Sequence, residues 1–278
     1  MTSMRVALVA FTTTGAAGDY VSALGTAMAD RAEVSMWIPS RPHLEVPGPE
    51  IHLLDKASSR AGVAAHEVLA SIGPSNLAKS ISAWAPDVVH IAFGEGYPSA
   101  ARVARALRGR CSVVATWHDP RPHGEPLDRV QHMVAALTMG AARGIHVHCA
   151  EVQPDDMSSQ ILIAEHPAFP CGSCGRSATT QPPRASGPIV FVGRFAPYKG
   201  IDQLCAALTD YWRAGGDRPL VVVGQGRAPK ALRDLEERWR SLTTVVNEYV
   251  SSRDLHDVLS NASVCAMPYL SGTQSALP

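Results

Sequence analysis

The sequence has little charge and no excess of either sign. Charged residues make up 18% of the 278 residues, and 25 Lys and Arg balance 25 Asp and Glu. A protein that coats nucleic acid or an anionic membrane carries a basic excess, so neither partner is expected here. The longest uncharged stretch lies near Val63–Trp84, and His66, Glu67 and Lys79 interrupt it, so no transmembrane span is expected.

Signals for export and for metal binding are also missing. The amino terminus leads directly into the apolar run Arg5–Phe11, which is too short for a signal peptide followed by a cleavage site. Of six cysteines, only Cys171 and Cys174 form a close pair, and no second C-x-x-C or H-x-x-x-H follows at the spacing of a zinc site. We interpret the pair as linker thiols and predict a cytoplasmic protein without a metal site.

Short β-branched runs alternate with stretches of helical periodicity along most of the chain. Strands are predicted at 5–11, 34–38, 51–54, 88–91, 112–117, 145–149 and 161–164, with helices at 20–29, 61–84 (in two pieces), 98–107, 127–142 and 154–158. A stretch rich in Pro, Gly, Ser and Thr then interrupts the pattern at 167–187, which predicts a linker. The alternation resumes with strands at 188–192, 220–223, 243–246 and 263–267, and helices at 200–211, 229–239 and 252–260.

This pattern predicts an α/β protein with two Rossmann-like domains, residues 1–166 and 188–278, joined by the linker 167–187. Short apolar strands between helices indicate parallel sheets that are covered on both faces. In such sheets ligands bind at the carboxyl ends of the strands. Functional residues are therefore expected in the loops that lead from strands into helices.

The loop G-R-F-A-P-Y-K-G at 193–200 has the strongest chemical signal. Arg194 and Lys199 lie five residues apart between glycines, at the start of a predicted helix. Two cations and free backbone N–H groups can neutralise a diphosphate without a metal. The alternative is an exposed Arg and Lys on an ordinary turn.

Four other loops carry weaker signals. The loop 12–19 contains Gly15 and Gly18, which suit either contact with an anion or a tight turn. It is not G-x-G-x-x-G, and no acid ends the second strand, so a dinucleotide fingerprint is unsupported. His118, in W-H-D-P-R-P-H-G at 117–124, suits acid–base or metal chemistry, or is an inert surface residue. The last two loops contain Gly224 with Gly226, and Gly272 with Thr273, where N–H and hydroxyl donors can meet phosphate.

Several segments resemble, in order, the retaining glycosyltransferases of family four. In the second domain these are F-V-G-R-F-A-P-Y-K-G-I-D at 191–202, V-V-V-G-Q-G at 221–226, and Y-V-S-S-R-D-L-H-D-V-L-S-N-A-S-V-C-A-M-P-Y at 249–269. G-A-A-G-D-Y at 15–20, D-V-V-H-I at 87–91 and W-H-D-P-R-P-H at 117–123 are similar in the first. The resemblance implies a GT-B fold and a hexosyltransferase-like enzyme without a cofactor. Such an enzyme moves a sugar from a UDP-, GDP- or other nucleoside-diphosphate donor to an acceptor, with retention at the anomeric carbon.

The resemblance also implies roles for individual residues. Arg194 and Lys199 match the pair that grips the donor diphosphate, and His118 matches a histidine that contacts the donor sugar. Glycines and helix-start residues match loops that face the donor phosphate, the nucleotide or the acceptor: Gly15, Gly18, Gly224, Gly226, Ser271, Gly272, Thr273 and Gln274.

The end of the chain departs from the family pattern. Many members carry two glutamates after the last predicted strand, whereas Ser271 stands at the first position and the second would fall just past Pro278. We therefore expect a chain cut short, with an incomplete second domain. The alternative function is a non-catalytic, nucleotide-sugar-binding remnant, and a related epimerase is disfavoured because the Y-K-G and T-Q-S loops resemble transferase loops.

The acceptor stays open, with a lipid-linked molecule or a secondary metabolite as the two classes considered. Four arginines, Arg102, Arg105, Arg108 and Arg110, are placed by the sequence pattern on one short helix. They suit an anionic lipid or membrane surface, or simply a solvated face. Membrane contact is thus expected to be peripheral at most.

Overall fold

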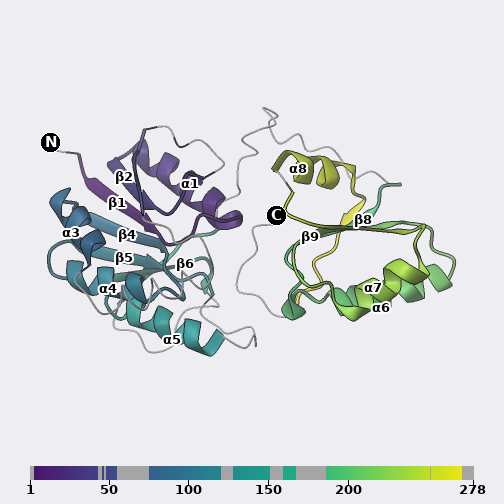
Figure 1. The fold of residues 1–278 in the computed structure, drawn as a ribbon. Helices are drawn as coiled ribbons and strands as arrows, with labels where there is room; N and C mark the ends of the chain where they lie inside the picture. Colours follow the sequence, from purple (N-terminus) through teal and green to yellow (C-terminus); the bar gives the residue numbers. More distant parts are fainter. Residues whose placement is uncertain are drawn as a thin grey trace. The chain divides into compact units, whose positions relative to one another are not determined.

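The computed structural model describes residues 3–42, 46, 48–54, 75–119, 128–150, 159–166, 186–250 and 252–270. The described residues form two compact units, 3–166 and 186–270, each with its own sheet (Figure 1). The predicted helices at 61–74 and 154–158, and the expected linker apart from its last two residues, lie outside the described ranges. No helix within those ranges is both long and apolar enough to cross a membrane.

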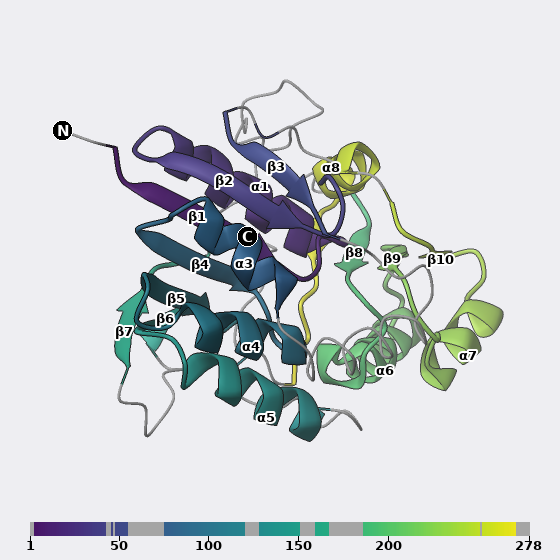
Figure 2. The same ribbon diagram turned by 60° about the vertical axis from the view of Figure 1, so that its left-hand side comes forward.

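The first unit is built on a sheet of seven parallel strands in the order β3-β2-β1-β4-β5-β6-β7 (Figures 1 and 2). The strands are β1 (Arg5–Ala10), β2 (Glu33–Ile38), β3 (Glu50–Leu53), β4 (Val88–Phe93), β5 (Ser112–Thr116), β6 (Gly144–Val147) and β7 (Gln160–Ile163). The helices are α1 (Ala16–Ala29), α3 (Asn76–Ala83), α4 (Pro98–Leu107) and α5 (Asp128–Met139).

Both faces of the first sheet are buried, which explains why its central strands are apolar at nearly every position. Residues of α3, α4 and α5 pack on one face, where Ile81, Leu107 and Met139 are almost fully buried. Tyr20 and Val21 of α1 pack on the other face. The helices begin where the sequence favours them: Ser75 caps α3 by accepting a hydrogen bond from Ala78 N (3.0 Å), and Pro98 occupies the first turn of α4.

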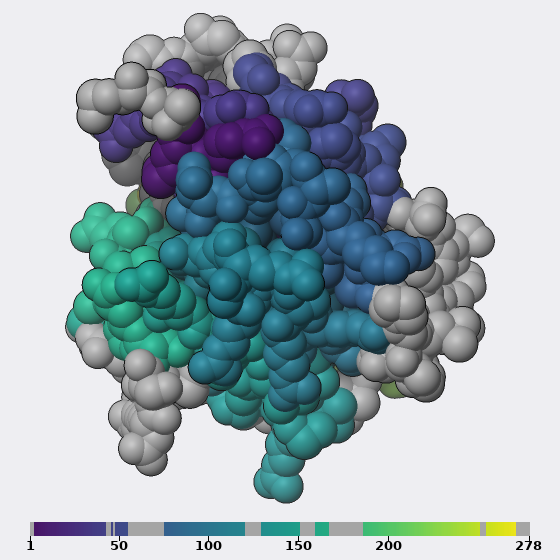
Figure 3. All heavy atoms as spheres, turned by 90° about the vertical axis from the view of Figure 1, so that its left-hand side faces the viewer, coloured from purple at the N-terminus to yellow at the C-terminus, as the bar shows by residue number. Residues whose placement is uncertain are grey.

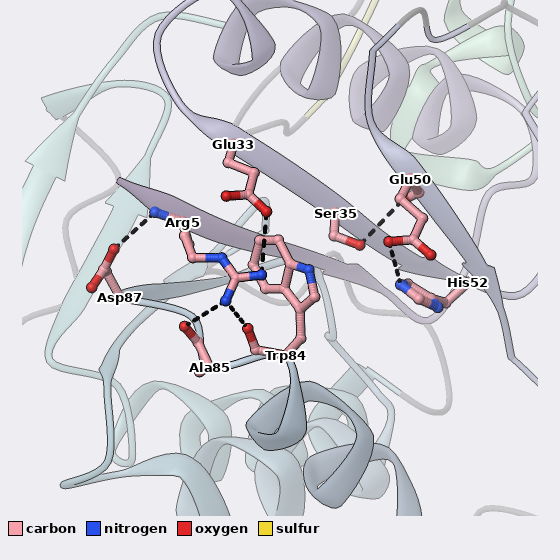
Figure 4. Close-up of polar contacts among 8 residues, drawn as sticks. All are labelled: Arg5, Glu33, Ser35, Glu50, His52, Trp84, Ala85 and Asp87. Carbon is pink, nitrogen blue, oxygen red and sulfur yellow. Dashed lines mark hydrogen bonds and ion pairs between the residues drawn. The ribbon is translucent and has the colours of Figure 1, made fainter. Parts of the chain in front are cut away.

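One arginine ties together the amino ends of the first strands (Figure 4). The Arg5 guanidinium lies 3.2 Å from Glu33 Oε1, donates to the carbonyl of Trp84, and stacks over the Trp84 ring at 4.1 Å. The Arg5 backbone N–H donates to Asp87 Oδ2 at 2.8 Å. These contacts join β1, β2 and the turn before β4 at the edge opposite the expected binding site.

The second unit has a parallel sheet in the order β10-β9-β8-β11, with β8 (Ile189–Val192), β9 (Leu220–Gly224), β10 (Thr243–Asn247) and β11 (Val264–Cys265). Helices α6 (Ile201–Arg213) and α7 (Lys230–Arg238) cover one face, and α8 (Ser252–Asn261) lies on the other side (Figures 1 and 2). The two parallel sheets confirm the expected α/β class with two Rossmann-like domains.

Candidate active site

In each sheet the strand order reverses at one place, and ligands of parallel α/β sheets bind at such switch points. In the first sheet the reversal falls between β1 and β4, and in the second between β8 and β11. The loops that follow these four strands contain Gly15, the segment 94–97, the segment 193–200 and the segment 266–270. Three of these follow from the sequence analysis, and the segment 94–97 is the one that it did not name.

The turn after β8 packs closely against the backbone of the segment that follows β11. Gly200 has φ +70° and directly precedes α6, and a Cβ at this position would lie 1.9 Å from the carbonyl oxygen of Pro268. Leu270 N donates to Tyr198 O at 2.8 Å in the same region. Only glycine fits here, so the turn that presents Lys199 is pinned to the segment that follows β11.

Arg194 and Lys199 both lie beside Tyr198 on this turn. Arg194 is exposed, and its Nη2 is 3.5 Å from the Tyr198 hydroxyl. Lys199 belongs to a short 3₁₀ turn, η2 (Pro197–Lys199), and its Nζ lies 3.8 Å from the centre of the Tyr269 ring and 5.1 Å from that of Tyr198. The predicted pair thus sits on one turn at the switch point, with neither cation in an ion pair among the residues of the described ranges.

The loop after β9 closes onto the same turn. A Cβ on Gly224 would lie 1.9 Å from the carbonyl oxygen of Gly193, and Phe195 N donates to Gln225 O at 3.2 Å. Gly226, with φ +145°, exchanges two hydrogen bonds with the Asn247 amide, at 3.1 and 3.0 Å. Gly224 is therefore required by its close approach to the Gly193 backbone and Gly226 by its positive φ, and both place the loop against Gly193 and Phe195.

In the first unit the glycine loop is shorter than the sequence suggested. Helix α1 begins at Ala16, four residues earlier than predicted, so Gly18 lies in its first turn. A Cβ on Gly18 would lie 2.5 Å from the carbonyl oxygen of Thr13. Gly15 is the residue before the helix, with φ +62° and no atom within 4 Å of the place a Cβ would take. Gly18 is thus explained by packing, and Gly15 by its backbone conformation.

His118 follows β5 and is buried, with 3% of its surface exposed. Its ring stacks on Phe93 at 3.9 Å between centroids and meets the edge of Tyr20 at 5.0 Å. Because a carbonyl oxygen only accepts, the 2.8 Å contact with Ala92 O assigns the proton to Nε2. His118 is therefore a fixed side chain at the carboxyl end of the sheet and not an inert surface histidine.

Glu95 holds the backbone on which His118 is carried, and sequence analysis missed it. Its Oε1 accepts hydrogen bonds from the backbone N–H of His118 and from that of Asp119 (3.2 Å). Burial, and secondarily the charge of Asp119, raises the pKa of Glu95 to about 8. An acid between two glycines, Gly94-Glu95-Gly96, directly after a strand is the signal that would have drawn attention to it.

A cluster of histidines surrounds Tyr20 at the same end of the sheet. His148 lies with its ring 5.2 Å from that of His118 and 4.7 Å from that of His146. A hydrogen-bonded chain runs across the strands, from His90 Nε2 to Thr116 Oγ1 (2.8 Å) to His146 Nδ1 (3.2 Å). Burial and repulsion between neighbouring imidazoles lower the pKa of His90 and of His148 to about 3 each, and burial lowers that of His146. His90, His146 and His148 are therefore neutral near pH 7.

No group of three or more His, Cys, Asp or Glu in the part of the chain that the structure describes is arranged to hold a metal ion. Ser271, Gly272, Thr273 and Gln274 lie outside the described residues, as do Cys171 and Cys174. Asp119 is described, but the rest of its loop, 120–127, is not. The roles expected for these residues stay predictions.

Residues 187–277 match the family described as "Glycosyl transferases group 1". No curated protein sequence matches the chain. Solved structures share its fold. The catalytic domain of starch synthase IV from Arabidopsis thaliana, bound to ADP and acarbose, is 12% identical, with a TM-score of 0.65 over 99% of this chain and 80% of the other. The α,α-trehalose 6-phosphate synthase of Burkholderia multivorans is also 12% identical, with a TM-score of 0.59 over the same shares.

A UDP-N-acetylglucosamine 2-epimerase has the fold as well, with 10% identity and a TM-score of 0.54 over 94% of this chain and 72% of the other. At these identities the structural likeness establishes the fold, and the family match adds the class of the second unit. Together they show a GT-B fold whose second unit is similar to the group 1 glycosyl transferases. The matched range 187–277 contains Arg194, Lys199 and both glycines of the loop after β9.

The neutral histidine cluster predicts that the first unit loses stability in acid. In the unfolded chain these histidines take up protons below pH 6.5, whereas in the fold His90 and His148 do so only near pH 3. The contribution of these two histidines to stability should thus be complete above pH 6.5 and be lost as the pH drops from there toward 3, by a few kcal/mol at about pH 4.5. Urea unfolding at several pH values, followed by the methyl NMR signals of Val89 and Ile145, measures it.

The variant His90→Asn removes one of these protonation sites and should make the loss less steep. Methyl signals of Val222 report the second unit in the same samples and serve as the internal control. An unchanged slope in the variant would contradict this account of the cluster.

The raised pKa of Glu95 predicts a pH dependence of stability opposite in sign to that of the histidines. Its pKa is about 8 in the fold against an ordinary 4.5, so the contribution of Glu95 to stability should fall as the pH rises through this window, in the opposite direction to that of the histidines. Glu95→Gln keeps an acceptor for both N–H groups without the charge. Its stability relative to the wild type should therefore grow between pH 4.5 and 8, as measured by the same unfolding experiment.

Glu95→Ala provides the comparison, since it removes the acceptor. Amide exchange at His118 and Asp119 should become faster in Glu95→Ala and stay near the wild-type rate in Glu95→Gln. Equal exchange in all three proteins would show that Glu95 does not hold this loop.

Proposed function

We propose that the chain is a glycosyltransferase that moves a sugar from a nucleoside-diphosphate-sugar to an acceptor with retention of anomeric configuration and without a metal. The observation that carries the proposal is the presence of Arg194 and Lys199 on one turn at the switch point of a sheet in the matched range 187–277. The ADP bound in the starch synthase neighbour supports a nucleotide donor of this type.

The chemistry that these residues supply is charge stabilisation. As the glycosidic bond to the donor breaks, negative charge builds on the departing diphosphate. Arg194 offers a planar fork of donors, and Lys199 a point charge held against the Tyr269 ring. The amino end of α6 directly follows and has no side-chain cap, so its first N–H groups are available to the same anion.

The first unit supplies fixed, uncharged groups in this proposal. His118 is proposed to contact the donor sugar, as the resemblance implies, and Glu95 fixes the backbone that carries His118. Retention is proposed to arise from departure and attack on the same face of the sugar, with the leaving phosphate receiving the acceptor proton. The acceptor is a lipid-linked molecule or a secondary metabolite.

Two other functions are tested in the same assay. A non-catalytic binder would bind nucleotide sugars without turnover, and an epimerase, whose fold is shared, would convert the donor without needing an acceptor. Incubation with a panel of UDP-, GDP- and ADP-sugars and candidate acceptors, with mass spectrometry of products, separates the three. A glycosylated acceptor with the anomeric configuration of the donor supports the proposal.

Arg194→Ala and Lys199→Ala should each reduce kcat by about 100-fold or more, roughly 3 kcal/mol, because the loss falls mainly on the transition state. Donor affinity should fall less. Steady-state kinetics with the donor identified above measure both quantities.

Arg213→Ala is the matched control, because it removes an exposed arginine from the opposite end of α6. It should leave kcat unchanged. Near-wild-type turnover in both Arg194→Ala and Lys199→Ala would contradict the diphosphate role.

Activity should survive EDTA, since Arg194, Lys199 and the α6 amino end are proposed to do the work of a divalent cation. The sequence has no Asp-x-Asp motif to carry one. Turnover measured after dialysis against EDTA, with and without added Mg²⁺ or Mn²⁺, tests this. Strict dependence on either ion would rule out the metal-free mechanism.

A further inference from the structure

A hollow of about 680 Å³ lies at the amino-end edge of the first sheet, the edge opposite His118 and Glu95. It is lined by residues of the turns before β4, β5 and β6, among them Asp87, Arg108, Arg110, Ser112 and Arg143. Figure 3 looks onto this edge of the first unit. Nothing in the proposed transferase chemistry uses these residues.

Two neighbouring turns bring three arginines to this hollow. Helix α4 ends at Leu107, so Arg108 and Arg110 do not continue it, contrary to the helix predicted for the four arginines. Gly109, with φ +84°, reverses the chain between them. Arg143 directly precedes β6, and its N–H donates to Val113 O of β5 at 2.8 Å.

The positive charge in the hollow is not compensated. Arg108, Arg110 and Arg143 are exposed, and none has an ion pair or a side-chain hydrogen bond with another residue of the described ranges. The carboxylate of Asp87 already accepts a hydrogen bond from Arg5 N at 2.8 Å (Figure 4). Three arginines therefore line one hollow with a single, already engaged carboxylate, and such a concave, positively charged surface concentrates anions.

A purely structural role for these arginines, at the helix ends, is the alternative to ligand binding. Helices α4 and α5 both end at this edge, and cations near a helix carboxyl end stabilise the helix. That role predicts a loss of stability on substitution and no ligand. It accounts for an arginine near each helix end but gives no reason for a hollow of small-molecule size between them.

We propose that this hollow binds a phosphate-bearing anion. The guanidinium fork matches two phosphate oxygens at once, and three such forks from two turns can surround one phosphate or diphosphate group. The volume lies within the usual range of small-molecule sites. A free phosphorylated metabolite and a phospholipid headgroup share this chemistry. The inference does not rest on the proposed transferase activity.

The test uses inorganic pyrophosphate as the probe and NMR as a local readout. Pyrophosphate is titrated at about 0.15 M salt, where exposed charges are largely screened. The protein carries Arg194→Ala and Lys199→Ala, so that the proposed donor site does not compete. We expect saturable shifts of the Gly109 and Gly140 amides, and at least about a tenfold weaker affinity in each of Arg108→Ala, Arg110→Ala and Arg143→Ala.

Arg105→Ala is the matched control, because Arg105 is an exposed arginine in the last turn of α4 that does not line the hollow. It should leave the affinity unchanged. Arg143→Lys keeps the charge without the fork and should give an intermediate affinity.

Vesicles separate the two sources of phosphate. Phosphatidylcholine vesicles with and without phosphatidylglycerol are sedimented with the wild type and with the three arginine variants. Binding that needs both phosphatidylglycerol and the arginines identifies a headgroup, and pyrophosphate binding without vesicle binding identifies a free anion. Either result supports the proposal.

The proposal is overturned if no saturable shift and no arginine-dependent vesicle binding occur. It is also overturned if pyrophosphate shifts the same amides equally in Arg105→Ala and the three pocket variants. Lower stability of the pocket variants without any binding would assign the arginines to the helix ends instead.

Discussion

Strands that run parallel within a sheet place all their carboxyl ends at one edge, and the rest of this structure depends on that constraint. In the first unit it brings together the ends of β1, β4 and β5, with Gly15, Glu95 and His118. In the second it brings together the loops after β8, β9 and β11. Gly200 and Pro268, which lie 68 positions apart in the chain, meet because the strands before them, β8 and β11, are neighbours.

The residues of the candidate site that could be predicted from sequence are those whose position is set by neighbouring residues in the chain. Arg194 and Lys199 are recognisable because the chain itself carries glycines around them and a helix directly after them. The existence and type of nearly every described helix and strand follow from hydrophobic period in the same way. Boundaries moved by a few residues, as at α1, where Gly18 belongs to the helix because its missing side chain lets the first turn approach Thr13.

The residues that the sequence analysis missed owe their roles to contacts with residues far away in the chain. Glu95 becomes important only through two N–H groups more than twenty residues later. His90 and His146 look like isolated polar residues in apolar strands, and only the adjacency of β4, β5 and β6 shows that Thr116 links them. The burial that sets their pKa values depends equally on tertiary packing, which no local pattern encodes.

The two units also differ in whether the ionisable groups near their strand ends are charged. In the second, the cations of the candidate site are exposed or half-buried and sit on a turn shaped by glycine contacts. In the first, the ionisable groups His90, His148 and Glu95 are held in their uncharged forms near pH 7 by burial. A surface that meets a diphosphate needs positive charge, whereas a surface that orients sugar hydroxyls needs neutral donors and acceptors in fixed positions. This division of charge is what a donor-binding unit and a sugar-facing unit would each require.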